Sequence, residues 1–373
     1  MKTKTGLLGG LSPQAFLHEH WQKKPLLIRG ALPGFTGLLS PKDLMDLACL
    51  EEAQSRLITR RHDSWQVRHG PFTPRAFSRL PAARWTLLVQ DVNHFLPSAR
   101  ELLLKFSFIP HARLDDLMVS YAPAGGGVGP HFDSYDVFLL QGMGCRRWEI
   151  SAQHDRALIA EAPLKILQDF RPEQEWLLEP GDMLYLPPGY AHNGIAEDHC
   201  MTYSIGFRAP SYQELTVQFL VHLQDHSDID GMYRDPDLAR QPHPGRISPA
   251  MLRQTKAVLD KIQWRSSDIE CFLGTYLTEP KPHVFFTPPI QPMTWKKFVQ
   301  KIRKGKLTLN LKSRMLCGKK IVFLNGQAYP VHDSTRKSLE KLADACTVSA
   351  GRDLDDEAAA LCYQWYLHGF IDL

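Results

Sequence analysis

Residues 125–133 read Gly-Gly-Gly-Val-Gly-Pro-His-Phe-Asp, a glycine-rich turn followed by two potential metal ligands. His131 and Asp133 are two positions apart, and on a β-strand the side chains of residues i and i+2 face the same side. An isolated His-x-Asp pair is more often structural than catalytic. A second segment that supplies a ligand is needed before this pair indicates a metal site.

Residues 179–192 read Glu-Pro-Gly-Asp-Met-Leu-Tyr-Leu-Pro-Pro-Gly-Tyr-Ala-His and provide such a segment. The pattern predicts a tight turn, a buried strand and a Pro-Gly corner that ends in His192. In a double-stranded β-helix this corner can return His192 to face an earlier His-x-Asp pair. Two histidines and one carboxylate form the facial triad of non-haem Fe(II) oxygenases. We therefore expect His131, Asp133 and His192 to bind iron.

Short segments with strand character surround these motifs and are separated by Gly and Pro turns. Regular spacing of this kind is typical of an all-β sandwich or barrel. The predicted strands are Leu117–Ala122, Tyr135–Gln141, Arg147–Ile150, Glu175–Leu178, Met183–Leu186 and Met201–Phe207.

Helical spacing replaces the strand pattern after residue 210, and proline-rich breaks follow near residues 235–249 and 279–292. Three domains are therefore predicted, at 1–210, 211–279 and 280–373. The last is expected to combine helices with a hairpin of Leu307–Leu311 and Ile321–Leu324 that turns at Asn325-Gly326. The predicted helices beyond residue 210 are Tyr212–Gln224, Pro249–Ile262, Trp295–Arg303, Ser334–Ala345 and Asp356–His368.

The composition is that of a globular protein, because 43% of the 373 residues are hydrophobic and 23% are charged. This excludes a disordered or fibrous chain. The seven cysteines are dispersed without a Cys-x-x-Cys pair, which argues against a disulfide framework and a zinc ribbon. There is no secretory signal pattern, and no apolar run approaches the roughly 18 residues of a membrane span. We expect a soluble cytoplasmic protein without membrane contact.

The net charge of +4 is unevenly distributed along the chain. Residues 281–373 carry 15 Lys and Arg against 8 Asp and Glu, whereas residues 1–280 carry 29 against 32. The basic run from Lys296 to Lys320 contains no acidic residue and could contact phosphates. A solvated face that supports a dimer or a basic substrate is the simpler interpretation, so nucleic-acid binding is not expected.

The stretch Gly144-Cys145-Arg146-Arg147-Trp148 bears on the choice of co-substrate. An iron oxygenase that uses 2-oxoglutarate needs a buried cation for the distal carboxylate of that acid. Successive side chains on a strand face opposite ways, so only one of Arg146 and Arg147 can point inward. The spacing does not decide which.

Several stretches together resemble the bacterial ribosomal oxygenases, which are cupin-like proteins of the Jumonji-C class. The resemblance covers nearly the whole chain, and its glycine-rich motif is rarely met outside this group. It is carried by residues 115–138 (DDLMVSYAPAGGGVGPHFDSYDVF), 144–148 (GCRRW), 179–192 (EPGDMLYLPPGYAH), 203–210 (YSIGFRAP), 20–30 (HWQKKPLLIRG) and 230–236 (DGMYRDP).

The resemblance implies an α+β protein with a double-stranded β-helix of the jelly-roll or cupin type, a helical dimerisation segment and a C-terminal winged-helix-like domain. It implies a homodimer that uses Fe(II), 2-oxoglutarate and dioxygen. The implied reaction is hydroxylation of an arginine side chain in a protein of the large ribosomal subunit, the sixteenth in the usual naming.

By position, the resemblance assigns His131, Asp133 and His192 to iron and favours Arg146 as the partner of the distal carboxylate. Ser120 matches a position that hydrogen-bonds the co-substrate. Thr202 stands where an asparagine is expected, although a threonine hydroxyl can still donate a hydrogen bond. An arginine substrate needs an acidic or aromatic wall, for which the residues near the motif are Tyr121, Tyr135 and Asp136, with Asp115 and Asp116 as further carboxylates.

Two other functions stay open at this point. One is a metal-dependent cupin enzyme that does not use 2-oxoglutarate, in which Arg146 has no catalytic importance. The other is a DNA-binding regulator with a vestigial barrel, supported by the basic run in the C-terminal domain.

Overall fold

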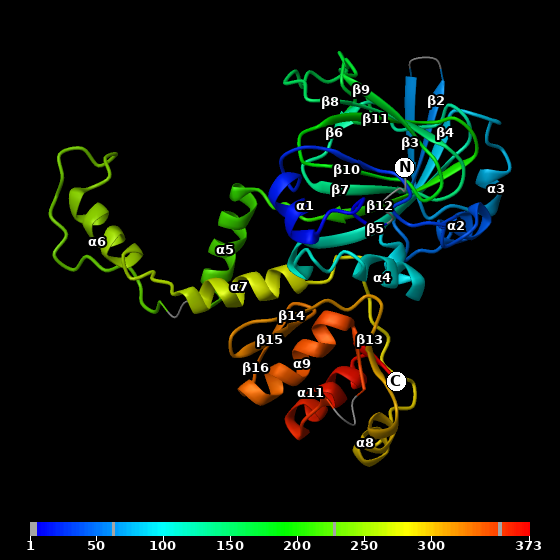
Figure 1. The fold of residues 1–373 in the computed structure, drawn as a ribbon. Helices are drawn as coiled ribbons and strands as arrows, with labels where there is room; N and C mark the ends of the chain where they lie inside the picture. Colours follow the sequence, from blue (N-terminus) through cyan, green and yellow to red (C-terminus); the bar gives the residue numbers. More distant parts are fainter. Residues whose placement is uncertain (1–5, 62–63, 227–228, 350–352) are drawn as a thin grey trace.

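A computed structural model describes residues 6–61, 64–226, 229–349 and 353–373. Three parts follow one another along the chain (Figure 1): a β-rich body up to residue 210, a helical arm over residues 212–278 and a C-terminal module from residue 281. No helix among the described residues is long and apolar enough to cross a bilayer.

The described strands of the β-rich body form two antiparallel sheets. The larger sheet has the order β1-β10-β7-β12-β5-β4-β2-β3, and the smaller has the order β6-β11-β8-β9. The strands are β1 (Leu26–Ile28), β2 (Ser55–Arg61), β3 (Ser64–His69), β4 (Trp85–Val89), β5 (Leu114–Ala122), β6 (His131–Phe132), β7 (Asp136–Gln141), β8 (Arg146–Ser151), β9 (Gln174–Leu178), β10 (Met183–Leu186), β11 (Ala191–Ala196) and β12 (Cys200–Phe207).

All six strands predicted in this region are present, five of them within one residue of the expected bounds, whereas β5 begins three residues earlier than predicted. The structure adds β6 and β11, which carry the two histidines, and the three neighbouring strands β2, β3 and β4 of the larger sheet. These three strands extend the sheet beyond β5, so a longer part of the chain than predicted builds the barrel wall.

The outer face of the larger sheet is covered by the N-terminal helices α1 (Pro13–Glu19), α2 (Pro41–Leu47) and α4 (Pro97–Leu104), with the short α3 (Pro74–Phe77) beside them. Ser12 and Ser40 cap α1 and α2, each ahead of a proline in the first turn. Phe16 on α1 is fully buried, and its ring lies 4.9 Å from that of Tyr185. This packing leaves the inner face of the sheet free to form a cavity.

The helical arm consists of α5 (Tyr212–His226), α6 (Pro249–Leu259) and α7 (Ser266–Thr278). Helix α6 stands away from the rest of the molecule (Figure 1) and buries none of its side chains. Helix α7 packs instead on the C-terminal module, where Gly274 lies so close to the ring of Phe323 that a Cβ would come within 2.2 Å of it.

The C-terminal module has its own core around Phe298, Leu339 and Trp365. Its strand β13 pairs with β17 and β18, whereas Asn325-Gly326 joins β15 to β16. The predicted hairpin between Leu307–Leu311 and Ile321–Leu324 was therefore wrong, although its turn was correct. The elements are α8 (Trp295–Lys304), β13 (Leu307–Leu309), β14 (Met315–Cys317), β15 (Ile321–Leu324), β16 (Gln327–Pro330), α9 (Asp333–Ala345), β17 (Thr347–Val348), α11 (Asp356–Leu367) and β18 (Ile371–Asp372).

A group of ion pairs, which we call the junction cluster, joins the C-terminal module to the β-rich body. The carboxylate of Asp91 is 2% exposed and lies 2.8 Å from Nζ of Lys281 and 3.4 Å from Nε2 of His283. Lys281 and Arg314 also each lie 3.4 Å from Oδ1 of Asp115 on β5. The module is thus attached directly to a strand that lines the cavity.

Candidate metal centre and its cavity

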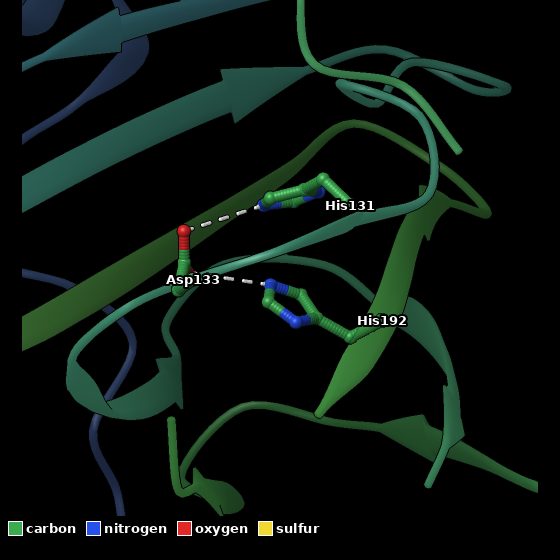
Figure 2. Close-up of side chains that lie close together, drawn as sticks. All are labelled: His131, Asp133 and His192. Atoms are coloured by element: carbon green, nitrogen blue, oxygen red, sulfur yellow. Dashed lines mark ion pairs between the residues drawn. The ribbon is translucent and has the colours of Figure 1, made fainter. Parts of the chain in front are cut away.

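Three predicted ligands meet between the two sheets (Figure 2). Strands β6 and β11 pair antiparallel with His192 opposite His131, and Asp133 follows β6 directly. Oδ1 of Asp133 lies 3.9 Å from Nε2 of His131, and its Oδ2 lies 3.5 Å from Nε2 of His192. The ligand atoms of all three residues lie within 4.8 Å of one another. The strand pairing therefore brings together residues that are about 60 positions apart in the sequence.

Backbone carbonyls set the orientation of both imidazoles. Nδ1 of His131 lies 2.9 Å from the carbonyl oxygen of Gly129, and Nδ1 of His192 lies 3.0 Å from that of Tyr190. A carbonyl oxygen can only accept, so each Nδ1 carries the proton and donates. Each Nε2 then faces the space beside the Asp133 carboxylate, as a metal-ligating histidine requires.

The charges of the three side chains suit a cation. Burial and the neighbouring His192 lower the pKa of His131 to about 4, so its ring is neutral near pH 7. Burial alone would raise the pKa of Asp133, but hydrogen bonding and charge from His192, together with His131, lower it below its ordinary value. The result is one carboxylate and two imidazole nitrogens on one side of a space.

The glycine run is required by close backbone contacts. A Cβ at Gly127 would lie 2.5 Å from the carbonyl oxygen of Gly194 on β11, and Gly129 has φ +83°. A larger residue at Gly127 would push the ligand loop away from β11, which carries His192, whereas one at Gly129 would strain a left-handed backbone and crowd Trp65. The motif thus allows the loop to lie directly on the strand that completes the triad.

Arg146 lies in the cavity beside the triad, whereas Arg147 does not. Arg146 is 4% exposed, and its Nε and Nη2 atoms are buried without a hydrogen-bond partner. No ion pair to it is found among the described residues. Arg147 faces outward and pairs with three glutamates, Glu149, Glu175 and Glu197. The structure therefore places Arg146 inward, which the spacing alone left open.

Ser120 and Thr202 lie directly opposite each other on β5 and β12, and both line the same cavity of about 480 Å³. This volume is in the usual range for a small-molecule site. The Thr202 hydroxyl donates a 3.0 Å hydrogen bond to the side chain of Gln141. A cavity with this lining can hold a small polar acid between the triad and Arg146.

Two of the three residues expected beside the substrate lie elsewhere, and this corrects the prediction. Tyr121 follows Ser120 on β5 and therefore faces the outer side of the sheet, where its hydroxyl bonds Nδ1 of His199 at 2.8 Å. Asp136 also faces outward and accepts hydrogen bonds from Tyr185 at 2.6 Å and Gln22 at 2.9 Å. Neither residue lines the cavity.

The third, Tyr135, does line the cavity at its partly exposed mouth, near Asp133. Asp116 lines the same cavity and is 7% exposed. The N–H of Asp91 donates a 3.1 Å hydrogen bond to its Oδ2. Burial, reinforced by the charges of Asp91 and Asp115, raises the pKa of Asp116 to about 7.

The cavity has two ends, defined by β12. Thr202 marks one end with Ser120, and Gly206, four residues later, marks the other with Asp116 and Val137. Four residues of strand span about 13 Å. One end thus holds the hydroxyls, while the other holds a carboxylate.

Sequence reasoning missed several residues of this lining, among them Trp148 and Arg56. Trp148 follows Arg146 by two positions on β8, and its ring lies 5.9 Å from that of His192. Side chains two positions apart on a strand face the same side, so an inward Arg146 could have indicated an inward Trp148. Arg56 on β2 also lines the cavity, and its Nε is buried without a hydrogen-bond partner. No signal pointed to Arg56, because no strand was predicted there.

Comparisons with known proteins find one family match in the β-rich body and another in the C-terminal part of the chain. The JmjC domain family matches residues 101–215, and the ROXA-like winged helix family matches residues 261–372. The ribosomal protein uL16 3-hydroxylase of Escherichia coli is 33% identical over 337 residues, which are 90% of this chain and 89% of that protein. A probable ribosomal oxygenase of Haemophilus influenzae is 39% identical over 265 residues, covering 68% of this chain and 62% of that protein.

Solved structures of E. coli YcfD, a ribosomal oxygenase, share the whole architecture. One of them covers 97% of this chain and 98% of its own, with a TM-score of 0.86 and 31% identity. Another, in complex with cobalt and 2-oxoglutarate, has a TM-score of 0.84 with the same coverage. With its JmjC domain, its winged helix and its assembled triad, the chain belongs to the family of ribosomal oxygenases.

Proposed function

We propose that this protein is an Fe(II)- and 2-oxoglutarate-dependent oxygenase that hydroxylates an arginine side chain of ribosomal protein uL16. The observation that carries the proposal is the buried, unpaired guanidinium of Arg146 in the same cavity as the facial triad. A buried cation without a partner is costly, so the fold is complementary to an anionic ligand at this place.

The donor set fits iron. His131 and His192 would bind through Nε2 and Asp133 through a carboxylate oxygen, which leaves coordination positions for co-substrate and dioxygen. When bound, the iron with 2-oxoglutarate and dioxygen supplies the oxidation that places one oxygen atom on a substrate carbon. The chain itself needs no general base, because its residues bind, orient and exclude water.

The co-substrate end of the cavity is set by Arg146, with Ser120 and Thr202 nearby. On β8, Arg146 lies four residues before Ile150, which pairs with His192. A dicarboxylate held at the triad by one end can therefore reach the guanidinium with the other. The ring of Trp148 lies 5.8 Å from Cζ of Arg146 and 5.9 Å from the ring of His192, so it lines the path between these two points.

The choice of arginine rests on the opposite end of the cavity. Asp116 offers a buried carboxylate for a guanidinium, and Tyr135 offers an aromatic wall close to Asp133. A carboxylate and an aromatic face are the two groups that bind a guanidinium best. The likeness to the uL16 3-hydroxylase supports uL16 as the protein that carries this arginine, and the cytoplasm as the location.

Mass spectrometry tests the proposal directly. The iron-loaded protein is incubated with a ribosomal lysate and 2-oxoglutarate, and uL16 is then searched for a mass increase of one oxygen atom on an arginine. The control is the Asp133→Ala variant, which lacks one of the three ligands. An unchanged uL16, or an oxygen on another residue type, would refute arginine hydroxylation.

The same assay addresses the metal-dependent cupin enzyme without 2-oxoglutarate. That function predicts product formation in the absence of 2-oxoglutarate and no loss in Arg146→Ala. The assembled triad and cavity give no support to a regulator with a vestigial barrel.

We also propose that the helical arm forms a homodimer. Apolar side chains on α6 face solvent in the single chain, with Leu252 59% and Leu259 58% exposed. A contiguous apolar helix face is expected to be covered by another surface. Light scattering should give twice the mass of one chain, and Leu252→Glu with Leu259→Glu should reduce it to that of one chain.

A further inference from the structure

Helix α8 and the residues just after it carry a dense group of exposed cations. They occur within eleven residues, and we call them the α8 basic face: Lys296, Lys297, Lys301, Arg303, Lys304 and Lys306. At 100° per residue, the five on the helix fall within an arc of about 160°. Phe298 and Ile302 lie on the opposite side of α8 and are buried in the core of the module.

In the described part of the structure these cations stand without acidic partners. No ion pair to any of the six is found among the described residues. The sequence contains no Asp or Glu between Glu279 and Asp333. Lys297 and Lys301 are four positions apart and Lys301 and Lys304 three, distances at which like charges on a helix repel each other. An ordinary solvated surface intersperses the two signs, and this one does not.

The α8 basic face lies apart from the cavity and from the helical arm, to which functions have already been assigned. In Figure 1, α8 is at the far end of the C-terminal module, away from the β-rich body with its cavity and from the arm that carries α6. Trp295, at the start of the helix, packs its ring against those of Phe298 and Tyr363 on the core side of α8, so the face itself consists of cations alone. A dense group of cations on one exposed face is typical of surfaces that bind a nucleic-acid backbone.

We propose that the α8 basic face is a docking surface for the phosphate backbone of RNA. From the sequence alone a solvated face was the simpler interpretation, but the structure adds that the charges share one face and pair with no carboxylate of the described residues. A ribosomal protein substrate is itself cationic and would be repelled. The choice of RNA as the polyanion rests on the proposed function, because uL16 is a protein of an RNA particle.

The contact would be with the backbone rather than with base edges. Helix α11, the last helix of the winged helix, begins with Asp355, Asp356 and Glu357 and contains no Lys or Arg. Such a helix is not suited to enter a nucleic-acid groove. Binding is therefore expected to be independent of sequence and strongly dependent on salt.

Fluorescence anisotropy with a labelled single-stranded RNA of mixed sequence tests this surface on the full-length protein. The test variant carries Lys297→Gln, Lys301→Gln and Lys304→Gln. The matched control carries Lys319→Gln, Lys320→Gln and Lys337→Gln, which are also exposed but lie outside α8. The test variant should bind at least about tenfold more weakly near 100 mM salt, and its slope of log K against log salt should be shallower by about 2. The control should match the wild type.

Equal RNA binding by the two variants would overturn the proposal. It would also be overturned if the wild type preferred duplex DNA or vesicles containing phosphatidylglycerol to the RNA. Hydroxylation of a short uL16 peptide, measured in parallel, should be the same in the test variant and the wild type. This readout separates the two proposals, since failure of peptide hydroxylation in the wild type concerns the active site alone.

Discussion

Arg146 and Arg147 are neighbours on β8, yet the guanidinium of Arg146 lies unpaired inside the cavity while that of Arg147 lies outside among three glutamates. Adjacent residues of the same type therefore have separable roles. The difference arises from strand alternation, and it provides a matched pair of variants at one place in the fold.

The first prediction uses this pair. Arg146→Ala should raise the KM for 2-oxoglutarate by about thirtyfold or more, because a charge-assisted hydrogen bond contributes about 2 kcal/mol. Arg147→Ala should leave this KM unchanged and cost at most about 1 kcal/mol of stability, as expected for a partly exposed ion pair. Steady-state kinetics with varied 2-oxoglutarate measures both. A similar KM in the two variants would remove Arg146 from the co-substrate site.

The second prediction concerns the metal. His131→Ala and Asp133→Ala should each abolish binding of Fe(II), or of Mn(II) as a stable substitute, because two ligands cannot form a facial triad. Wild-type protein should be stabilised against heat by added metal and the two variants should not. His154→Ala is the control, since His154 is exposed and is not one of the three clustered ligands. Metal-dependent stabilisation retained in Asp133→Ala would contradict the assignment.

The third prediction concerns pH. The raised pKa of Asp116, about 7, means that the carboxyl of the free enzyme becomes neutral as the pH falls through that value. A neutral Asp116 no longer attracts a guanidinium, so kcat/KM for the peptide should decrease below about pH 7. Asp116→Asn should have a lower kcat/KM than the wild type, and its kcat/KM should not decrease further between about pH 8 and 6. If kcat/KM of Asp116→Asn still decreases below about pH 7, the decrease is caused by the titration of another group and the prediction is wrong.

The fourth prediction concerns the junction cluster. Lys281→Met leaves the buried carboxylate of Asp91 without its closest cation, which should cost about 3 kcal/mol in the free energy of unfolding. Burial acts to raise the pKa of Asp91, but the charge of Lys281 lowers it. The loss should therefore be present above about pH 4 and fade as the pH falls through the lowered value.

Urea unfolding at several pH values measures this loss. Lys312→Met is a control at the same interface, because Lys312 pairs with the largely exposed Glu52 and should cost less than about 1 kcal/mol. Asp91→Asn in the Lys281→Met background should recover part of the loss. If the double variant is no more stable than Lys281→Met, the unpaired carboxylate is not the cause.

Much of the metal centre could be predicted from sequence because its elements are local. The strand alternation at His131 and Asp133, and the Pro-Gly corner before His192, fix which side chains share a face. The same alternation could have excluded Tyr121, which follows the inward-facing Ser120, and Asp136, which precedes the inward-facing Val137. Proximity along the chain was a poor guide there.

Other features depend on contacts that no local pattern contains. Strand β2 reads Ser-Arg-Leu-Ile-Thr-Arg-Arg and alternates weakly, so its pairing with β4 and the inward position of Arg56 are set by the sheet as a whole. Asp116 gains its raised pKa from burial and from Asp91, which is 25 residues away in the sequence. Such long-range effects appear only once the tertiary structure is known.

The two ligand imidazoles are held by carbonyls of their own loops, two residues upstream in each case. No neighbouring side chain is needed to aim them. The rest of the cavity wall can therefore be substituted while the ligand orientation is kept. In an engineered enzyme, Asp116 could be replaced to accept a different amino acid, and the metal affinity should change little.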